Sequence, residues 1–88
     1  LGGNLDVNGN DIVSTSNADI DIVPHGTGKT SLGGTSGVKL PVGDTSERVN
    51  VTGVIRFNSD TGLPEYFNGT SYIAIDSPPA VSSVLELL

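Results

Sequence analysis

Two acidic residues near the middle of the first half of the chain are suited by type and spacing to chemistry. Asp19 and Asp21 are separated by one residue, so in an extended strand both carboxylates point to the same side. Glycosidic cleavage uses paired carboxylates, but they must face each other across a cleft with their pKa values pushed apart. We expect instead the solvated side of a strand whose apolar side carries Ile20 and Ile22, without a catalytic or calcium-binding role.

His25 is the single histidine, and the chain has no cysteine, so one chain cannot close a zinc site. Its place beside Pro24 predicts a surface turn. The alternative is a trimer in which three copies of His25 meet on the axis and bind an ion. Serine and threonine are plentiful, but a nucleophile needs a base and a group that orients the base. We therefore expect no catalytic, metal-binding or cofactor-binding residues, no cofactor and no enzymatic activity.

The run Gly26-Thr27-Gly28-Lys29-Thr30 matches the end of the phosphate-binding pattern G-x-x-x-x-G-K-S/T. The leading glycine of that pattern is replaced by Val23, and the next residue is a proline, which has no N–H to offer a phosphate. The residues that follow are rich in glycine and do not predict the helix that would hold the anion. The run predicts a β-turn and no nucleotide site.

Size and composition limit how the chain can be stabilised. Only 35% of its 88 residues are hydrophobic, and only two tyrosines and two phenylalanines are aromatic. Small domains with little core need a disulfide, a metal or association with other chains, and the first two are not available to this sequence. Oligomerisation is the remaining device. The formal net charge of −6 disfavours nucleic acid as a partner, and no apolar run reaches the ~20 residues needed for membrane insertion.

Residues 1–48 alternate single apolar residues with polar ones and interrupt them with glycine-containing turns. Asn8-Gly9, His25 to Gly28, Gly33-Gly34 and Ser36-Gly37 are the predicted turns. The strands between them would have about four to six residues. Segments 5–14 and 19–32 share a loose pattern of strand, turn and strand, which favours stacking or winding around identical chains. An ordinary β-sandwich with long loops is the alternative.

Residues 49–76 contain all four aromatic residues and predict a three-stranded β-meander. The expected strands are 54–58, 65–67 and 71–75, joined by turns at Asp60 to Gly62 and at Asn68-Gly69. Pro64 cannot donate to a ladder, so the second strand should begin after it or lie at an edge there. We expect the meander to be filled by the apolar residues Ile55, Phe57, Phe67, Ile73 and Ile75.

Residues 77–88 begin with Pro78-Pro79 and end in an apolar stretch. Val81, Val84, Leu85 and Leu88 have helical spacing, and Pro78 suits a first helical position, which predicts a short amphipathic helix. The alternative is a stiff Pro-Pro connector leading into a neighbouring domain. Because the chain begins at Leu1 and shows no leader sequence, we expect it to be an internal piece of a longer protein.

The segment 53–75 resembles a short module that recurs in tail fibres of tailed bacteriophages, notably marine and cyanobacterial myoviruses. The resemblance is carried by Gly53, Ile55, Arg56, Phe57, Asn58, Thr61, Gly62, Glu65, Tyr66, Phe67, Asn68, Gly69, Thr70 and Tyr72. Tyr72 stands where the family usually has tryptophan. The segments NLDVNGNDIVS and IDIVPHGTGKTSLGG are similar to repeats in phage fibre shafts.

The resemblance implies a homotrimeric fibre in the virion that connects other tail or baseplate proteins with a tip that attaches to the host. We accordingly expect an all-β, elongated segment: a turn-rich shaft of triple β-helix or β-prism type (1–48), the meander (49–76) and a connector (77–88). The candidate seam between chains is formed by apolar residues of the shaft, namely Leu5, Val7, Ile12, Ile20, Ile22, Leu32, Val38 and Leu40.

Three other roles remain open at this point. Direct binding of host surface glycans or a protein receptor would use an exposed aromatic or acidic patch around Tyr66 and Tyr72. A depolymerising tailspike would use Asp19 or Asp21. The third role is that of a bacterial surface adhesin.

Overall fold

A computed structural model describes residues 2–76 of the chain. The chain divides into two compact units, with the boundary between Thr35 and Ser36. We refer to residues 2–35 as the N-terminal unit and to residues 36–76 as the sheet unit. The described residues are all-β in class, with one four-stranded mixed sheet and a single short 3₁₀ turn.

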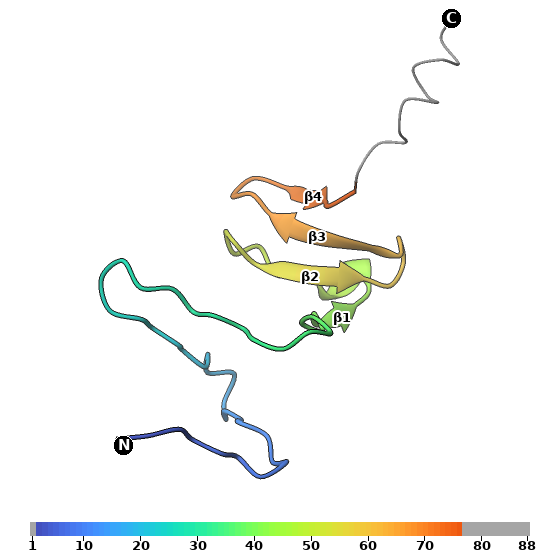
Figure 1. Ribbon diagram of the computed structural model, residues 1–88. Coiled ribbons are helices and arrows are strands. Elements are labelled where there is room, and N and C mark those ends of the chain that lie inside the picture. Colours follow the sequence, from blue (N-terminus) through green and yellow to red (C-terminus); the bar gives the residue numbers. More distant parts are fainter. Residues whose placement is uncertain (1, 77–88) are drawn as a thin grey trace, which may run out of the picture. The chain divides into compact units, whose positions relative to one another are not determined.

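The sheet has the strand order β1-β2-β3-β4 (Figure 1). Its strands are β1 (Val42–Gly43), β2 (Ile55–Asn58), β3 (Leu63–Phe67) and β4 (Tyr72–Ala74), and the 3₁₀ turn η1 (Thr45–Glu47) follows β1. The pairs β2–β3 and β3–β4 are antiparallel, whereas β1 lies parallel to β2. The three-stranded meander predicted from the sequence is confirmed, with strand ends that differ by one or two residues.

The parallel strand β1 was not predicted. Two backbone bonds flank its pairing with β2: Phe57 N–H donates to the carbonyl of Pro41 at 2.8 Å, and Ser59 N–H donates to that of Gly43 at 2.9 Å. A two-residue strand carries no period-2 pattern that a sequence could display. The pairing of β1 with β2 nevertheless matters for the site, because it brings residues 44–49 across one face of the meander.

β3 begins at Leu63, so the first of the two alternatives for Pro64, that the second strand starts after it, was wrong. Pro64 lies opposite Phe57 in the β2–β3 ladder. The N–H of Phe57 donates away from β3, to Pro41, and the carbonyl of Pro64 accepts from Ile75 N–H at 2.7 Å. The two residues therefore form a pair without mutual hydrogen bonds, where the missing proline N–H leaves no partner in β2 unsatisfied.

The two faces of the meander differ from the expected arrangement. Alternation along the strands places Arg56, Asn58, Glu65 and Phe67 on one side, which we call the inner face, and all four are buried. Ile55, Ile73 and Ile75 are exposed and Phe57 is half-buried. Phe67 is thus the only one of the five predicted filling residues that is buried. The prediction failed because residues 44–49 cover the polar face of the sheet, so the interior of this unit is mainly ionic.

The N-terminal unit contains the expected turns at Asn8-Gly9 and at His25 to Gly28, whereas the chain only bends at Gly33-Gly34, without a closing hydrogen bond. Asn10 N–H donates to the carbonyl of Val7 at 2.9 Å, and the central residues Asn8 and Gly9 both have positive φ, of 52° and 77°. Two positive φ angles define a type I′ turn, the type that matches the twist of a β-hairpin. A second turn of this kind, at Ser16-Asn17, was not predicted; its φ angles are 57° and 60°.

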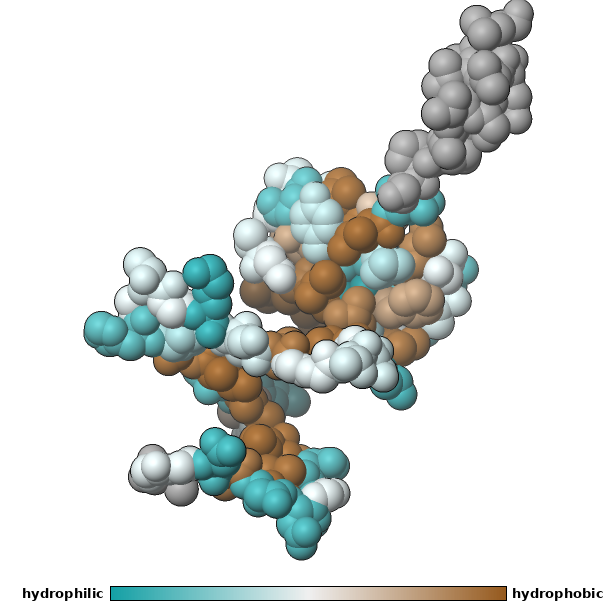
Figure 2. Space-filling view, viewed as in Figure 1, coloured by the Kyte–Doolittle hydropathy of each residue, from teal (hydrophilic) through white to brown (hydrophobic). Residues whose placement is uncertain are grey.

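No strand is formed within residues 2–35, contrary to the short strands expected there. The backbone–backbone hydrogen bonds of this unit close three turns, at Asn10–Val7, Ala18–Thr15 and Gly28–His25. A strand needs a backbone partner for its N–H and C=O groups, and the extended segments between the turns have none among residues 2–76. Figure 2 shows apolar side chains on the surface of this unit, and every residue in it is exposed.

The predicted helix or connector at residues 77–88 lies outside the described residues. Within the described part of the chain, no helix has the length and apolar character required to cross a membrane.

Candidate functional site

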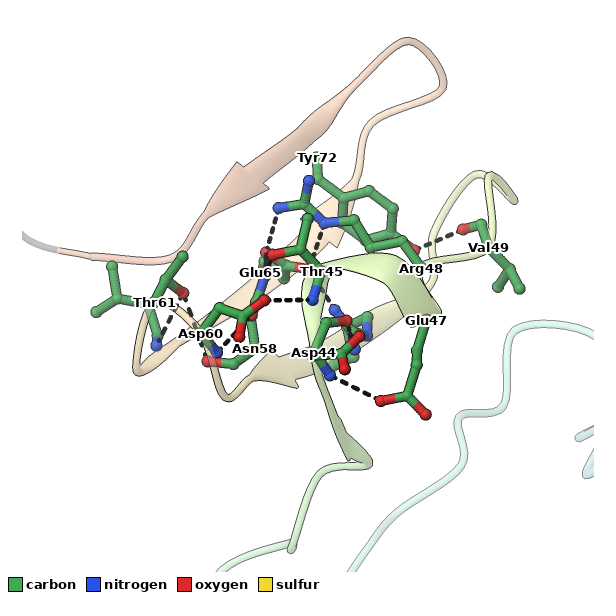
Figure 3. Close-up of polar contacts among 12 residues, drawn as sticks. Asp44, Thr45, Glu47, Arg48, Val49, Asn58, Asp60, Thr61, Glu65 and Tyr72 are labelled. Carbon is green, nitrogen blue, oxygen red and sulfur yellow. Dashed lines mark hydrogen bonds and ion pairs between the residues drawn. The ribbon is translucent and has the colours of Figure 1, made fainter.

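The densest group of polar side chains lies on the inner face of the sheet unit, around Glu65, which is only 2% exposed (Figure 3). Glu65 accepts from Arg48 through Nε at 2.9 Å and Nη2 at 2.7 Å. It also accepts from Arg56 Nη1 at 2.7 Å and from Asn58 Nδ2 at 3.1 Å. Both carboxylate oxygens are therefore occupied by two donors each. We call Arg48, Arg56, Asn58 and Glu65 the ionic cluster.

The strand register brings three members of the ionic cluster together. Arg56 and Glu65 are directly opposite each other in the antiparallel β2–β3 ladder. Asn58 lies two residues beyond Arg56 and hence on the same face, where it is fully buried. Opposite charges at facing positions stabilise such a pair, and burial makes the pairing obligatory because an unpaired charge in the interior is costly.

The fourth member, Arg48, is delivered by the segment that follows β1. The guanidinium of Arg56 donates from Nη2 to the carbonyl of Asp44 at 2.8 Å, which fastens the start of this segment to β2. Asp44 N–H donates to Glu47 Oε1 at 2.9 Å across η1, and Arg48 follows directly. The ionic cluster thus helps to hold residues 44–48 on the sheet.

The absence of a side chain at Gly43 lets Arg56 and Glu47 come close to the backbone of β1. A Cβ added to Gly43 would lie 2.6 Å from Arg56 Nη2 and 3.1 Å from Glu47 Oε1. Those distances leave no room for a side chain unless Arg56 moves away from Asp44. The requirement for glycine at this position is therefore one of space, imposed by the ionic cluster.

The turn between β2 and β3 is tied to η1 by a second set of bonds. Asn58 Oδ1 accepts from Asp60 N–H at 2.9 Å, while Asn58 Nδ2 donates to Thr45 Oγ1 at 3.0 Å. Thr45 N–H in turn donates to Asp60 Oδ2 at 2.9 Å. All buried side-chain nitrogen and oxygen atoms in the described residues have a hydrogen-bond partner, as a stable polar interior requires.

An aromatic pair closes the other end of the ionic cluster. The rings of Phe67 and Tyr72 have centroids 5.2 Å apart and are tilted by 55°. The guanidinium carbon of Arg48 lies 4.7 Å from the centroid of Tyr72, in cation–π contact. The hydroxyl of Tyr72 donates to the carbonyl of Val49, so the tyrosine also holds the chain just after Arg48.

The electrostatics fix the charge state of the ionic cluster. The hydrogen bond from Arg48, together with those from Asn58 and Arg56, lowers the pKa of Glu65 to about 2. The same bond raises the pKa of Arg48. The backbone N–H of Thr45 lowers the pKa of Asp60. A general acid or base works best with a pKa near the working pH and a lone pair or proton to offer. Glu65 meets neither condition, because its pKa is low and each of its oxygens already accepts two hydrogen bonds.

The residues singled out for chemistry in the sequence are not brought together. Asp19, Asp21 and His25 are all exposed in the N-terminal unit. His25 lies in a turn, as predicted, and its carbonyl accepts from Gly28 N–H at 3.0 Å. Lys29 donates only to the nearby carbonyl of Thr27, at 3.5 Å. No pocket and no group of three or more potential metal ligands occurs within residues 2–76.

Tyr66 and Tyr72 do not share a patch. Tyr72 lies opposite Phe67, on the inner face, and is half-buried, whereas Tyr66 lies opposite Ile73 and is 39% exposed. The two tyrosines therefore belong to opposite faces of the sheet.

Sequence reasoning missed the ionic cluster as a unit. A signal for it was present, since Arg56 and Asn58 share one side of a predicted strand and Glu65 and Phe67 share one side of the next. Pairing these strands through the turn at Asp60 to Gly62 places opposite charges side by side. The contribution of Arg48 depends on β1 and had no local signal.

Comparison with known proteins adds no relative. The chain matches no protein-family model, no curated protein and no solved structure.

Proposed function

We propose that this chain is a structural segment of a homotrimeric tail fibre of a tailed bacteriophage, located in the virion and linking it to the host-attachment tip. The resemblance of residues 53–75 to a phage fibre module supports the viral part of this proposal. The trimer and the mechanical role are supported by the way the chain distributes its apolar side chains. Its partners are two further copies of itself and the neighbouring tail or baseplate proteins.

One observation carries the proposal: within residues 2–76 a single chain leaves most of its large apolar side chains in contact with solvent. Phe67 is the buried hydrophobic residue of the described chain. The exposed ones are Leu5, Val7, Ile12, Val13, Ile20, Ile22, Val23, Leu32, Val38, Val42, Val49, Val51, Ile55, Tyr66, Ile73 and Ile75. Scattered exposed apolar residues are normal, but residues 2–76 bury only one of them and so form no hydrophobic core within one chain. Association with other chains would supply the missing burial at the candidate seam residues.

The backbone of the N-terminal unit supports the same conclusion. Its extended segments have turn closures at their ends and no ladder partner between them. Unpaired N–H and C=O groups along an extended segment are a template for another strand. In a homotrimer the same segment of each of the other two copies could pair with it, because all three segments have the same turns at the same spacing. Backbone pairing and apolar burial would then form together.

The sheet unit suits a mechanical role for a different reason. Its segments are held by charge-assisted hydrogen bonds that are complete within one chain, from Arg48 and Arg56 to Glu65. Such bonds are short and directional. The unit therefore keeps its shape without a ligand, and its role in the fibre is that of a rigid spacer without catalytic activity.

The test is a charge placed on the candidate seam. Ile22 is 66% exposed, and Ile22→Asp would bury a carboxylate at each copy of the seam, so we expect the assembled chain to dissociate in sedimentation velocity. Val23→Asp is the matched control, since Val23 is 83% exposed and points to the opposite side of the segment. Retention of the wild-type sedimentation coefficient by Ile22→Asp would remove Ile22 from the seam. Dissociation of both variants alike would show a general effect of charge.

A further inference from the structure

The face of the meander opposite the ionic cluster is apolar, and most of its large side chains are exposed in the described part of the chain. We call it the outer face. The register aligns Ile55, Tyr66 and Ile73 in one row across β2, β3 and β4. Val42, Phe57 and Pro64 form a second row, which Ile75 extends through its N–H bond to the carbonyl of Pro64 at 2.7 Å. Figure 2 shows apolar side chains spread over the visible side of this unit.

The outer face is distinguished by the absence of charged side chains. The charged residues of β2 and β3, Arg56 and Glu65, both point to the inner face, where they neutralise each other. None of the seven residues of the outer face carries a charge. The chain as a whole has a formal net charge of −6, so two copies repel each other wherever their acidic groups approach. An uncharged face is the part of the sheet unit where copies can meet without that repulsion.

The size of the outer face limits how it can be used. Ile55, Tyr66, Ile73 and Ile75 are 46, 39, 39 and 43% exposed. Aromatic side chains bury roughly 150–250 Å² each and isoleucine is somewhat smaller, so the exposed parts of these four leave on the order of 300 Å² per copy. Two such faces would bury about 600 Å² together, whereas stable interfaces bury about 1,200–2,000 Å². The face fits one part of an interface whose remainder is supplied elsewhere in the same assembly.

We propose that the outer face packs against a second copy of this chain and forms the subunit interface of the sheet unit. This inference rests on the proposed homotrimer and adds to it the surface through which residues 36–76 take part. If the chains met only through the seam residues of the N-terminal unit, both rows of the outer face would stay exposed to solvent. A partner of different sequence would need an uncharged apolar surface of matching size, which every further copy of this chain already presents.

The absence of cysteine allows a direct test with single-cysteine variants of the whole chain. Ile55→Cys, Tyr66→Cys and Ile73→Cys each place one thiol in the first row. Val51→Cys is the control, because Val51 is 58% exposed and lies in the loop before β2. Each variant must first show the molecular mass and circular dichroism spectrum of the wild type. A variant that fails this check is left out, and the test uses the remaining positions of the row.

Two measurements are then made on the assembled protein. The thiols of the row should react with N-ethylmaleimide about tenfold more slowly than the control thiol, because reaction requires exposure. On oxidation, at least one row position should form a disulfide between chains, and the control should form none. Fast reaction at all three row positions would overturn the proposal. Slow reaction without any interchain disulfide would overturn it too, because the cover would then come from the same chain.

The mass of the same samples separates this inference from the proposed function. A single-chain mass would contradict the homotrimer itself. An assembled chain whose row thiols react fast would leave the homotrimer standing and reject only the outer face as its interface.

Discussion

Arg56 and Glu65 face each other across β2 and β3 and form an ion pair of 2.7 Å in the interior of the sheet unit. Their side chains are 8% and 3% exposed. An ion pair in this position takes the place of a hydrophobic core. Removing one partner from such a pair leaves a buried charge, which is why the stability of the unit should depend on its polar residues more than on its apolar ones.

Asn58 provides the clearest test of that dependence. Asn58→Asp places a negative charge where the amide now donates to Glu65 Oε1 at 3.1 Å and to Thr45 Oγ1 at 3.0 Å. Loss of two buried donors together with like-charge repulsion should destabilise the unit by about 2–4 kcal/mol in urea unfolding. Asn50→Asp makes the same change of charge at an exposed position and should have little effect. Equal effects of the two variants would contradict a structural role for the ionic cluster.

The pH dependence of stability should reflect Glu65. Its pKa falls from 4.5 to about 2 on folding, so the folded state favours the ionised form. The corresponding stabilisation is fully present above pH 4.5 and is lost as the pH falls towards about 2. Urea midpoints measured over this interval should therefore decrease with falling pH. Asp60, whose pKa is also lowered, should contribute to the same slope.

Glu65→Gln separates the contribution of Glu65 to the pH dependence from that of Asp60. The variant should be less stable at neutral pH, and its urea midpoint should vary less between pH 4.5 and 2 than that of the wild type. Asp19→Asn removes an exposed carboxylate of the N-terminal unit and should leave the slope unchanged. A Glu65→Gln slope as steep as the wild-type slope would exclude Glu65 as its source.

Gly43 tests the space around the ionic cluster. Gly43→Ala should displace Arg56 from the carbonyl of Asp44 and destabilise the sheet unit by about 1–3 kcal/mol in urea unfolding. Gly33→Ala is the matched control, because a Cβ at Gly33 would meet nothing within 4 Å. If Gly43→Ala left the free energy of unfolding unchanged, residues 44–48 could move off the sheet without loss of stability.

The two tyrosines differ in one hydrogen bond that can be removed. Tyr72→Phe keeps the ring beneath Arg48 but loses the bond to the carbonyl of Val49, at an expected cost of about 1 kcal/mol in thermal or urea unfolding. Tyr66 makes no hydroxyl bond to another residue in the described range, so Tyr66→Phe should be neutral. The reverse order of the two effects would contradict the assignment of Tyr72 to the inner face.

How far the sequence predicts this structure depends on the range of the interactions involved. The meander and its turns are local, and Asn68-Gly69 and Asp60 to Gly62 indicated them correctly. The turn at Ser16-Asn17 was missed because neither residue is a glycine, although asparagine tolerates positive φ better than most residues.

Four of the five residues expected to fill the meander lie on the outer face for a longer-range reason, and only Phe67 lies on the inner one. Alternation puts Ile55 with Phe57 and Ile73 with Ile75, but it cannot show which face a distant segment will cover. That choice is made by β1 and Arg48, at positions separated in sequence from the strands they join. Patterning determines which residues share a face, and the covering segment determines which face is inside.

The central claim, that this chain functions as a homotrimeric structural segment, is tested most directly by its molecular mass in solution. Light scattering coupled to size exclusion measures that mass independently of shape. The chain has a mass of 9.0 kDa, and we predict a species of three times that value. A stable species of 9.0 kDa, folded by circular dichroism, would contradict the account.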